Sequence, residues 1–570
     1  MPAYVLVAPD GPDASARTVT LVELDEHAAE TGRRTVAADA LPAEVARVEA
    51  ARSGAPPRWV WDDTRARYPA LLTAGVRVER SHDLRLCHAI LRHSATTTAS
   101  ALAQAPPGPW DADAPAPAPH APSLFDDLAL LDDLDALDDA PAPAAARDPL
   151  AELRAQLDAV AGATHPGRLR LLLAAESTGA LIAAEMHHDG LPWDAAVHDA
   201  ILTDLLGPRP WGGARPERLE ALADEIRTAL VAPHLNPDSP PDLLRALRLQ
   251  GFDVQSTSKW EVRGLDHPVV APLLEYKKLA RLLSANGWAW LDQWVHDGRF
   301  RPDYVVGGVV TGRWASDGGG ALQLPAQVRD AVRADPGWRL VVADAAQLEP
   351  RVLAAMSGDR DMAAAARHAD LYQGVADAGV VPTRKDAKYA MLGAIYGATS
   401  GAAAQLMPHL TRAFPRAVGL VEEAARAGER GDVVTTWLGR SSPPASAALR
   451  SALTAAAGEG AGADDVRETR RRARDRGRFT RNFVVQGTAA EWAMCWMASL
   501  RRRLRAIDGR PHLVFFLHDE VVVHSPAAVA DEVAAAVRAS ADEAGRLLFG
   551  AAPVDFALDL SVVDSYADAA

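Results

Sequence analysis

The sequence predicts an α+β fold in which a small α/β domain precedes a larger, mostly helical region that contains isolated strands. Short apolar runs alternate with polar turns up to about residue 98, and this pattern predicts the α/β domain. Two later stretches, residues 339–346 and 513–524, combine apolar runs with acids in a way that predicts strands. Most of the remaining chain beyond residue 150 is helical in pattern.

The apolar run at residues 339–346 is typical of a buried strand and carries Asp344 near its end. Burying a carboxylate there costs free energy unless a cation or a hydrogen-bond donor pairs with it, and a divalent metal ion is one such cation. The pattern then changes to QLEPRVLAAM, which predicts a helix beginning near Pro350. Gln347, Glu349 and Arg351 would crowd this strand-to-helix junction.

The stretch TRKDAKYAMLGAIYGATSG carries Arg384, Lys388, Leu392 and Tyr396 at intervals of four, so they follow one slowly drifting helix face. Two cations near a helix start can clamp a polyphosphate, and a phenol further along can pack on a base or sugar. An ordinary amphipathic helix with incidental cations is the alternative interpretation.

The stretch LVFFLHDEVVVH predicts a hairpin with His518, Asp519 and Glu520 at its tip. By itself the turn is a weak signal, because acids are ordinary turn residues. Just before it, RFTRNFVVQGTAAEW places Arg478, Asn482 and Gln486 at intervals of four.

Taken in order, these segments resemble family A DNA polymerases, the bacterial DNA polymerase I type. DAAQLEPRVLA is similar to the palm motif Asp-Tyr-Ser-Gln-Ile-Glu-Leu-Arg, in which Ala345, Ala346 and Pro350 depart from the pattern. The fingers pattern matches except at Leu392, where the family usually has Phe or Tyr. TGR before ALQLP, the His-Asp-Glu turn and the Gln-Gly-Thr-Ala-Ala segment also match. The resemblance runs from about residue 168 to the C-terminus.

The resemblance implies a right-hand polymerase with palm, fingers and thumb that extends a primer 3′ end from deoxynucleoside triphosphates by two-metal phosphoryl transfer. Asp344 and Asp519 would hold two Mg²⁺ ions, for which Mn²⁺ could substitute, and Glu520 would lie behind them. Lys388 would also protonate the pyrophosphate leaving group. The implied nucleotide-binding residues are Arg384, Lys388, Leu392, Tyr396, Gln347, Glu349 and His518.

The implied partner is primer-template DNA. Its expected contacts are Arg313, Gln323, Arg478, Asn482 and Gln486, together with Lys277, Lys278 and Arg281, which share a helix face that can lie along a duplex backbone. A merely solvated basic face is the alternative for the last three. A catalytically inactive, polymerase-like DNA-binding protein is the alternative function, and the presence of both Asp344 and Asp519 favours the enzyme.

Composition and resemblance together predict six segments. They are an exonuclease-like domain (1–100), an acidic linker (101–149), the polymerase N-terminal helices and thumb (150–300), the first part of the palm (301–358), the fingers (359–465) and the second part of the palm (466–570). The formal charge of −15 is unusual for a nucleic-acid binder, but ten Asp against one Arg between Asp111 and Asp148 account for about nine of those charges. The Ala, Pro and Asp-rich linker is expected to be a solvated spacer or, alternatively, to carry a partner-binding helix.

The chain resembles an actinobacterial-like short form of these polymerases. Its N-terminal domain resembles the ribonuclease H-like 3′–5′ exonuclease domain that precedes related polymerases. Its catalytic acids do not match. The first strand lacks the Asp-x-Glu pair, Glu23 and Asp25 lie one strand later in reversed order, and only Asp63 and Asp83 could be remnants of the middle acids. We therefore expect a structural domain without proofreading.

Cys87 and Cys495 are too few and too far apart to predict a disulfide framework, which fits a reducing compartment. No stretch of about 18 apolar residues and no signal-peptide pattern is present. We expect a cytoplasmic monomer that associates with the nucleoid when bound to DNA and has no membrane partner.

Overall fold

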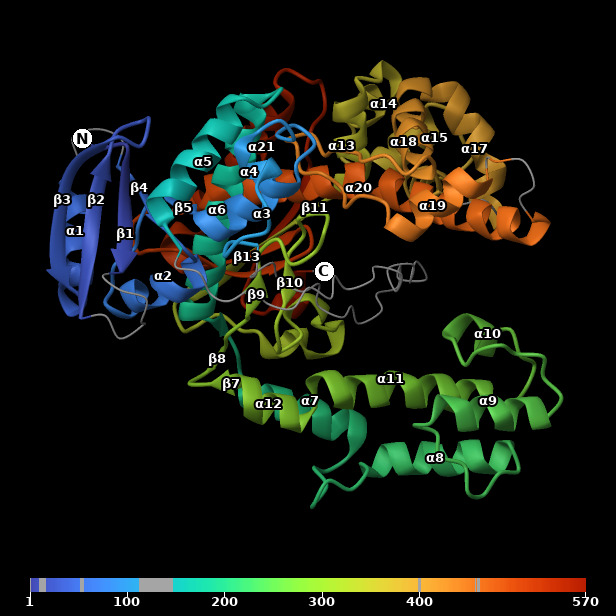
Figure 1. Cartoon of the computed structure of the whole chain (residues 1–570). Helices are drawn as coiled ribbons and strands as arrows, with labels where there is room; N and C mark the ends of the chain where they lie inside the picture. Colours follow the sequence, from blue (N-terminus) through green and yellow to red (C-terminus); the bar gives the residue numbers. More distant parts are fainter. Residues whose placement is uncertain are drawn as a thin grey trace. The chain divides into compact units, whose positions relative to one another are not determined.

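A computed structural model describes residues 2–9, 17–51, 56–111, 147–397, 401–456, 458 and 462–569 (Figure 1). The chain forms two compact units. The first comprises Met1–Asp189, Asp303–Asp317 and Val341–Val562, and the second comprises Gly190–Pro302, Gly318–Leu340 and Val563–Ala570. Each unit is described separately.

The first unit begins with a five-stranded sheet and its helices. In chain order these elements are β1 (Tyr4–Pro9), β2 (Thr18–Leu24), β3 (Glu30–Ala37), α1 (Leu41–Ala50), β4 (Arg58–Trp61), α2 (Thr64–Thr73), β5 (Ser81–Asp83), α3 (Leu84–His93), α4 (Ala101–Gln104), α5 (Pro149–Ala161) and α6 (Pro166–Asp189). The strand order is β3-β2-β1-β4-β5, with β1, β2 and β3 antiparallel and β4 and β5 parallel to β1. This is the small α/β domain that the alternating pattern predicted.

Both faces of this sheet are buried, because alternate residues of β1 point to opposite sides. Val5 packs in a core that includes Leu181 of α6. Leu6 packs in a second core with Trp110 and Leu153. The domain is therefore completed by helices that follow it in the sequence.

The predicted start of the linker at residue 101 is too early. Ser100 caps α4, and Trp110 is buried in the second core, where the guanidinium of Arg147 lies 4.9 Å from its ring centroid. Composition missed this segment because a single Trp anchors it within an Ala and Pro-rich run. Residues 112–146, including the possible partner-binding helix, lie outside the described residues.

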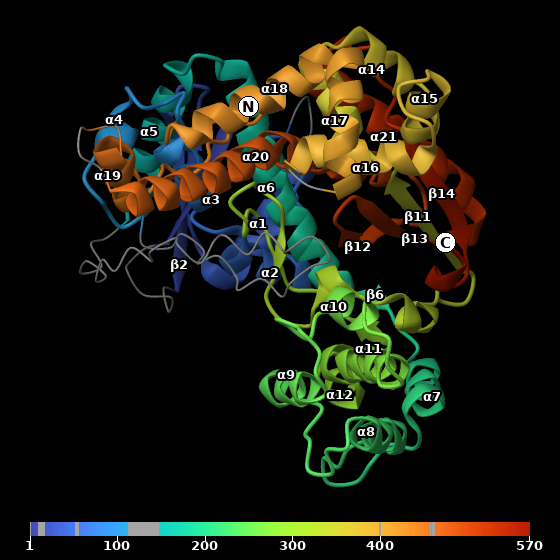
Figure 2. The same ribbon diagram turned by 90° about the vertical axis from the view of Figure 1, so that its right-hand side faces the viewer.

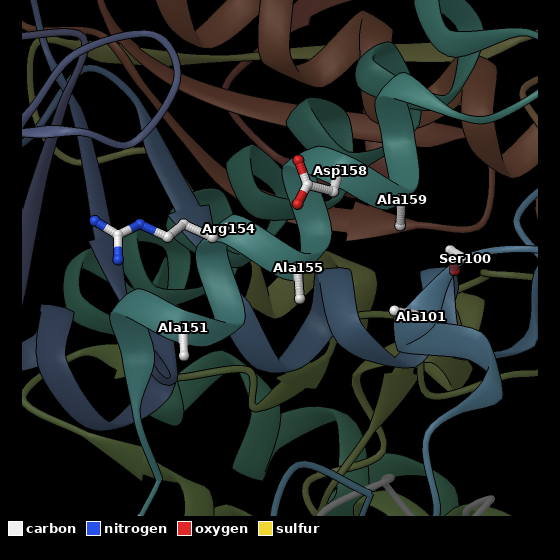
Figure 3. Close-up of a pocket in the computed structure, with 7 residues that line it drawn as sticks. All are labelled: Ser100, Ala101, Ala151, Arg154, Ala155, Asp158 and Ala159. Atoms are coloured by element: carbon white, nitrogen blue, oxygen red, sulfur yellow. The ribbon is translucent and has the colours of Figure 1, made fainter.

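A small pocket of about 420 Å³ lies between α4 and α5 (Figure 3). Its lining includes Ala101, Ala151, Ala155 and Ala159, whose methyl groups offer no chemistry, with Arg154 and Asp158 at its edge. None of the residues predicted to form a site lines it.

A buried ionic cluster joins the α/β domain to the two long helices α6 (Pro166–Asp189) and α20 (Ala463–Leu504). Arg501 donates to the carboxylate of Glu185 at 2.7 and 2.8 Å and to the carbonyls of Val78 and Glu79. Tyr68 donates to the same carboxylate at 2.6 Å. Burial alone would raise the pKa of Glu185, but the guanidinium of Arg501 and its other partners lower it to about 2. The carboxylate is thus held ionised inside the protein.

The remaining elements of the first unit are mostly helical. They are β9 (Tyr304–Val305), β10 (Ala315–Ser316), β11 (Trp338–Ala345), α13 (Leu348–Ser357), α14 (Arg360–Ala365), α15 (Leu371–Asp377), α16 (Arg384–Tyr396), α17 (Gly401–Ala413), α18 (Pro415–Glu429), α19 (Ala447–Ala456), α20 (Ala463–Leu504), β12 (His512–Leu517), β13 (Glu520–Pro526), α21 (Ala530–Phe549) and β14 (Leu558–Val563). β11 begins in the second unit and ends in the first. The four-stranded sheet has the order β12-β13-β11-β14, and α18 and α19 lie along α20 (Figure 2). Helices α13 to α18 share one core with the middle of α20.

The second unit is a helical body with a small three-stranded sheet. Its elements are β6 (Leu191–Pro192), α7 (Ala195–Leu206), α8 (Glu217–Ala229), α9 (Pro240–Leu249), α10 (Lys259–Arg263), α11 (Val270–Asn286), α12 (Trp288–Trp294), β7 (Val295–His296) and β8 (Arg299–Phe300), followed by short 3₁₀ turns. The region predicted as N-terminal helices and thumb, residues 150–300, therefore divides at Gly190, with α5 and α6 in the first unit. Within the part of the chain that the structure describes, no helix is both long and apolar enough to cross a bilayer.

Candidate active site

The predicted hairpin is formed by β12 and β13, and its two-residue turn consists of His518 and Asp519. His518 has a φ of 60°, the left-handed conformation that such tight turns use. The carbonyl of Asp519 accepts a hydrogen bond from the backbone N–H of Ala345 at 2.9 Å. The turn therefore abuts the end of β11, where Asp344 is located.

This arrangement brings the two predicted metal-binding acids together. Burial and the neighbouring carboxylate of Asp344 raise the pKa of Asp519 to about 7. Two neighbouring carboxylates disfavour each other's ionisation, so a cation is needed for both to be ionised. Their hard oxygen donors suit Mg²⁺ or Mn²⁺. The pair thus fits the expected ions, although no group of three or more His, Cys, Asp or Glu side chains suited to a metal occurs among the described residues.

Glu349 is fixed from two sides. Arg313 donates to one carboxylate oxygen at 2.5 Å, and the hydroxyl of Tyr396 donates to the other at 2.7 Å. Burial and the charge of Glu349 raise the pKa of Tyr396, so its proton stays in this bond. Hydrogen bonds therefore connect Arg313 of the TGR turn, Glu349 of α13 and Tyr396 of α16, which the sequence analysis predicted separately.

The strand and helix at this junction are close to the prediction. β11 covers Trp338–Ala345, and α13 begins at Leu348, two residues before Pro350. Gln347 precedes the helix with a φ of 50°, and its side-chain oxygen accepts from the backbone of Leu371 at 3.1 Å. Gln347, predicted to bind nucleotide, thus holds the start of α15.

Arg351 is fully buried and donates to backbone carbonyls, including those of Ala346, Ala366 and Asp555. Such a guanidinium ties several loops to one point of the fold. Arg351 therefore supports the junction from behind.

The predicted fingers helix is α16. Thr383 caps it by accepting from the N–H of Asp386, and Gly397 ends it with a φ of 72°. Arg384 forms an ion pair with Asp370 at 2.5 Å, whereas the side chain of Lys388 is exposed. The helix thus presents both predicted cations on its accessible side.

Leu392 is half-buried on the same helix, one turn beyond Lys388. Two residues that the sequence did not single out also lie here. Asp370 holds Arg384, and the buried ring of Tyr372 lies 6.0 Å from the same guanidinium. This acid and this aromatic residue lie at the start of the short helix α15, and no sequence motif would have revealed them.

Of the predicted DNA contacts on α20, Arg478 lies against the end of α16. An added Cβ at Gly397 would meet Arg478 at 3.2 Å, so the glycine allows close approach. Arg478 pairs with Asp475, and the buried side-chain oxygen of Asn482 has no hydrogen-bond partner among the described residues. Gln486 follows one turn later and is half-buried.

Four other predicted DNA contacts, Lys277, Lys278, Arg281 and Gln323, lie in the second unit. Lys278 and Arg281 are exposed on α11, although Lys278 is 3.6 Å from the carboxylate of Glu275. Lys277 instead donates to the carbonyl of Thr257, and burial lowers its pKa. The ammonium thus holds a loop in this structure, and its contact with a phosphate stays a prediction. Gln323 is exposed.

The acids considered as exonuclease remnants all serve the fold. Asp63 caps α2 and pairs with Arg85 at 3.0 Å. Asp83 is fully buried, caps α3 and accepts from the N–H of Thr64 at 2.7 Å. Asp25 closes a turn by accepting from two backbone N–H groups, and Glu23 pairs with Arg34.

Comparisons with known proteins identify similar sequences and a similar fold. The chain is 30% identical over 322 residues to DNA polymerase I of Chloroflexus aurantiacus and 27% identical over 405 residues to the thermostable DNA polymerase I of Thermus thermophilus. These matches cover 52% and 64% of this chain but 32% and 44% of the relatives, so the chain spans less than half of their length.

Among solved structures, the POL domain of Pol1 from M. smegmatis, in complex with DNA primer-template and dNTP, matches with a TM-score of 0.63 at 19% identity. The match covers 100% of this chain and 94% of that one, which shows the shared fold. The pattern of DNA polymerase family A matches residues 215–567, well over half of the chain. The chain belongs to DNA polymerase family A.

Proposed function

We propose that the protein is a template-directed DNA polymerase that adds deoxynucleotides to a primer 3′ end. The observation that carries this proposal is the pair of carboxylates at the β11 end and the β12–β13 turn, where the pKa of Asp519 is raised to about 7 beside Asp344. Family membership supports it, as does the fold shared with a polymerase domain described with primer-template DNA and dNTP.

In this mechanism Asp344 and Asp519 would hold the divalent ions, whose positive charge would stabilise the attacking 3′-hydroxyl oxygen and the leaving pyrophosphate. Arg384 and Lys388 neutralise the triphosphate, and we assign to Lys388 the proton that passes to the leaving group. Glu349, held by two partners, blocks the position of a ribose 2′-hydroxyl. The residues that the sequence analysis assigned to DNA contact the template, the primer or the duplex backbone.

We also propose that proofreading is absent and that the protein acts as a cytoplasmic monomer, at the nucleoid when bound to DNA. The absence of proofreading is supported by Asp63 and Asp83, because their carboxylates already pair with Arg85 or accept hydrogen bonds from backbone N–H groups.

A primer-extension assay with a labelled primer tests both proposals. Wild-type protein is expected to extend the primer only with Mg²⁺ or Mn²⁺ and to leave its 3′ end intact when nucleotides are withheld. A wild-type protein that binds primer-template but never extends it would favour the inactive DNA-binding alternative. Metal-dependent shortening that disappears in Asp83→Asn would show a working exonuclease.

Truncating Glu349 tests its role in sugar selection. In Glu349→Ala we expect the ratio of ribonucleotide to deoxynucleotide incorporation to rise by about tenfold or more, because the side chain held by Arg313 and Tyr396 is removed. Single-turnover reactions with each nucleotide measure the ratio. Glu423→Ala, which alters an exposed acid on α18, is the control, and an unchanged ratio in Glu349→Ala would assign the gate elsewhere.

Because residue 392 is a leucine, we expect the enzyme to discriminate against dideoxynucleotides and to have a raised KM for nucleotides. Leucine offers neither a hydroxyl nor an aromatic surface, and the lost aromatic contact is worth about 1 kcal/mol. Leu392→Tyr should increase dideoxy relative to deoxy incorporation, whereas Leu392→Phe should lower KM alone. If neither ratio nor KM changes, the side chain does not face the sugar.

A further inference from the structure

The side chain of Tyr389 is unusual for its exposure. It is 48% exposed, and every other described Phe, Tyr or Trp side chain of the first unit is buried or half-buried. An exposed ring with no packing role is a candidate contact for a planar ligand. The mechanism above leaves this residue unused.

Helical periodicity places the ring on the accessible side of α16. The opposite side, which includes Ala387, Ala390 and Ala394, is buried in the shared core. At 100° per residue, Tyr389 lies about 20° from Tyr396 and about 100° from Lys388 around the helix axis. It therefore lies at the edge of the accessible side away from the cations assigned to the triphosphate.

A cation accompanies the ring. The ammonium of Lys385 lies 5.8 Å from the ring centroid of Tyr389, one helical turn earlier. Both side chains are exposed, and no acid pairs with Lys385 in the described parts of the chain. The edge thus combines a flat apolar surface with a positive charge that is available to a phosphate.

An aromatic surface beside a cation is the combination by which proteins bind unpaired nucleic-acid strands without reading their sequence. Duplex DNA would leave the ring without a partner, because its bases are already stacked. We propose that Tyr389 and Lys385 bind the unpaired template strand ahead of the primer terminus, with a template base stacked on the Tyr389 ring. The proposal rests on the proposed function, which supplies the template.

Binding of primer-template to the full-length protein without nucleotides tests this contact. Fluorescence anisotropy would compare one primer paired with templates that leave a one-nucleotide or an eight-nucleotide 5′ overhang. Wild-type protein should prefer the long overhang. Tyr389→Leu should lower that preference by about fivefold or more, as expected for one lost base stack.

Matched variants separate the explanations. Tyr389→Phe keeps a ring and should keep the preference, and Lys385→Gln should make the preference less sensitive to salt. Val433→Ala, at another exposed apolar side chain of the unit, should change nothing. An unchanged preference in Tyr389→Leu would overturn the proposal. A raised nucleotide KM with the preference intact would also overturn it, and would assign the ring to the incoming nucleotide.

The same data distinguish this proposal from the proposed function, because binding is read without catalysis. If wild-type protein does not extend primers but Tyr389→Leu loses its overhang preference, the polymerase proposal fails and the template contact stands.

Discussion

Replacing Asp519 by Asn is expected to reduce nucleotide incorporation at least about a thousandfold, equivalent to about 4 kcal/mol of lost transition-state stabilisation. The amide removes one of two adjoining anionic oxygen donors and leaves Asp344 as the only carboxylate of the pair. Asp344→Asn should have the same effect. Affinity for primer-template should stay within several-fold, because phosphate contacts elsewhere supply it.

Single-turnover extension and DNA binding of the purified variants measure the two quantities. Asp361→Asn, which alters an exposed acid in the first turn of α14, is the control and should retain wild-type rates. Near wild-type extension by either active-site variant would refute the assigned metal site. A large loss of DNA affinity would instead indicate a misfolded hairpin.

The second large effect is expected on stability. Arg501→Met should lower the free energy of unfolding by about 3–5 kcal/mol, because the carboxylate of Glu185 would remain buried without its main partner. The variant should therefore show a lower midpoint in urea and in thermal unfolding. Arg502→Met is a matched control, since Arg502 is an exposed neighbour paired with Glu543 and should cost less than about 1 kcal/mol.

The same cluster predicts a pH dependence. The pKa of Glu185 is lowered to about 2 in the folded protein, against an ordinary value of 4.5. The ionised carboxylate therefore stabilises the fold above about pH 4.5, and this contribution is lost as the pH falls towards 2. Glu185→Gln should lose stability at neutral pH and show a smaller further loss on acidification. An identical acid-unfolding profile in wild type and Glu185→Gln would exclude this origin.

Local rules were sufficient for the elements that carry the candidate site. The hairpin followed from turn chemistry between two apolar runs, and α16 followed from residues spaced along one face. The carboxylate pair followed from a resemblance and from the cost of a buried acid. The sequence could not predict which side chains pair with each other, such as Tyr396 with Glu349 or Asp370 with Arg384.

Long-range packing explains the remaining differences. The cluster around Glu185 joins residues more than 300 positions apart, and no local pattern marks such a pair. Lys277 has the spacing of a phosphate contact but meets the carbonyl of Thr257. Trp110 lies in a segment whose composition is typical of disorder, although its burial anchors the segment to the sheet.

The core that β1 shares with α6 bears on how this chain could be shortened. Excising the first 111 residues would uncover Leu181 and leave Glu185 and Arg501 without Tyr68 and the carbonyls of Val78 and Glu79. The α/β domain therefore contributes part of the core of the first unit. A minimal catalytic fragment would require redesign of the newly exposed face of α6.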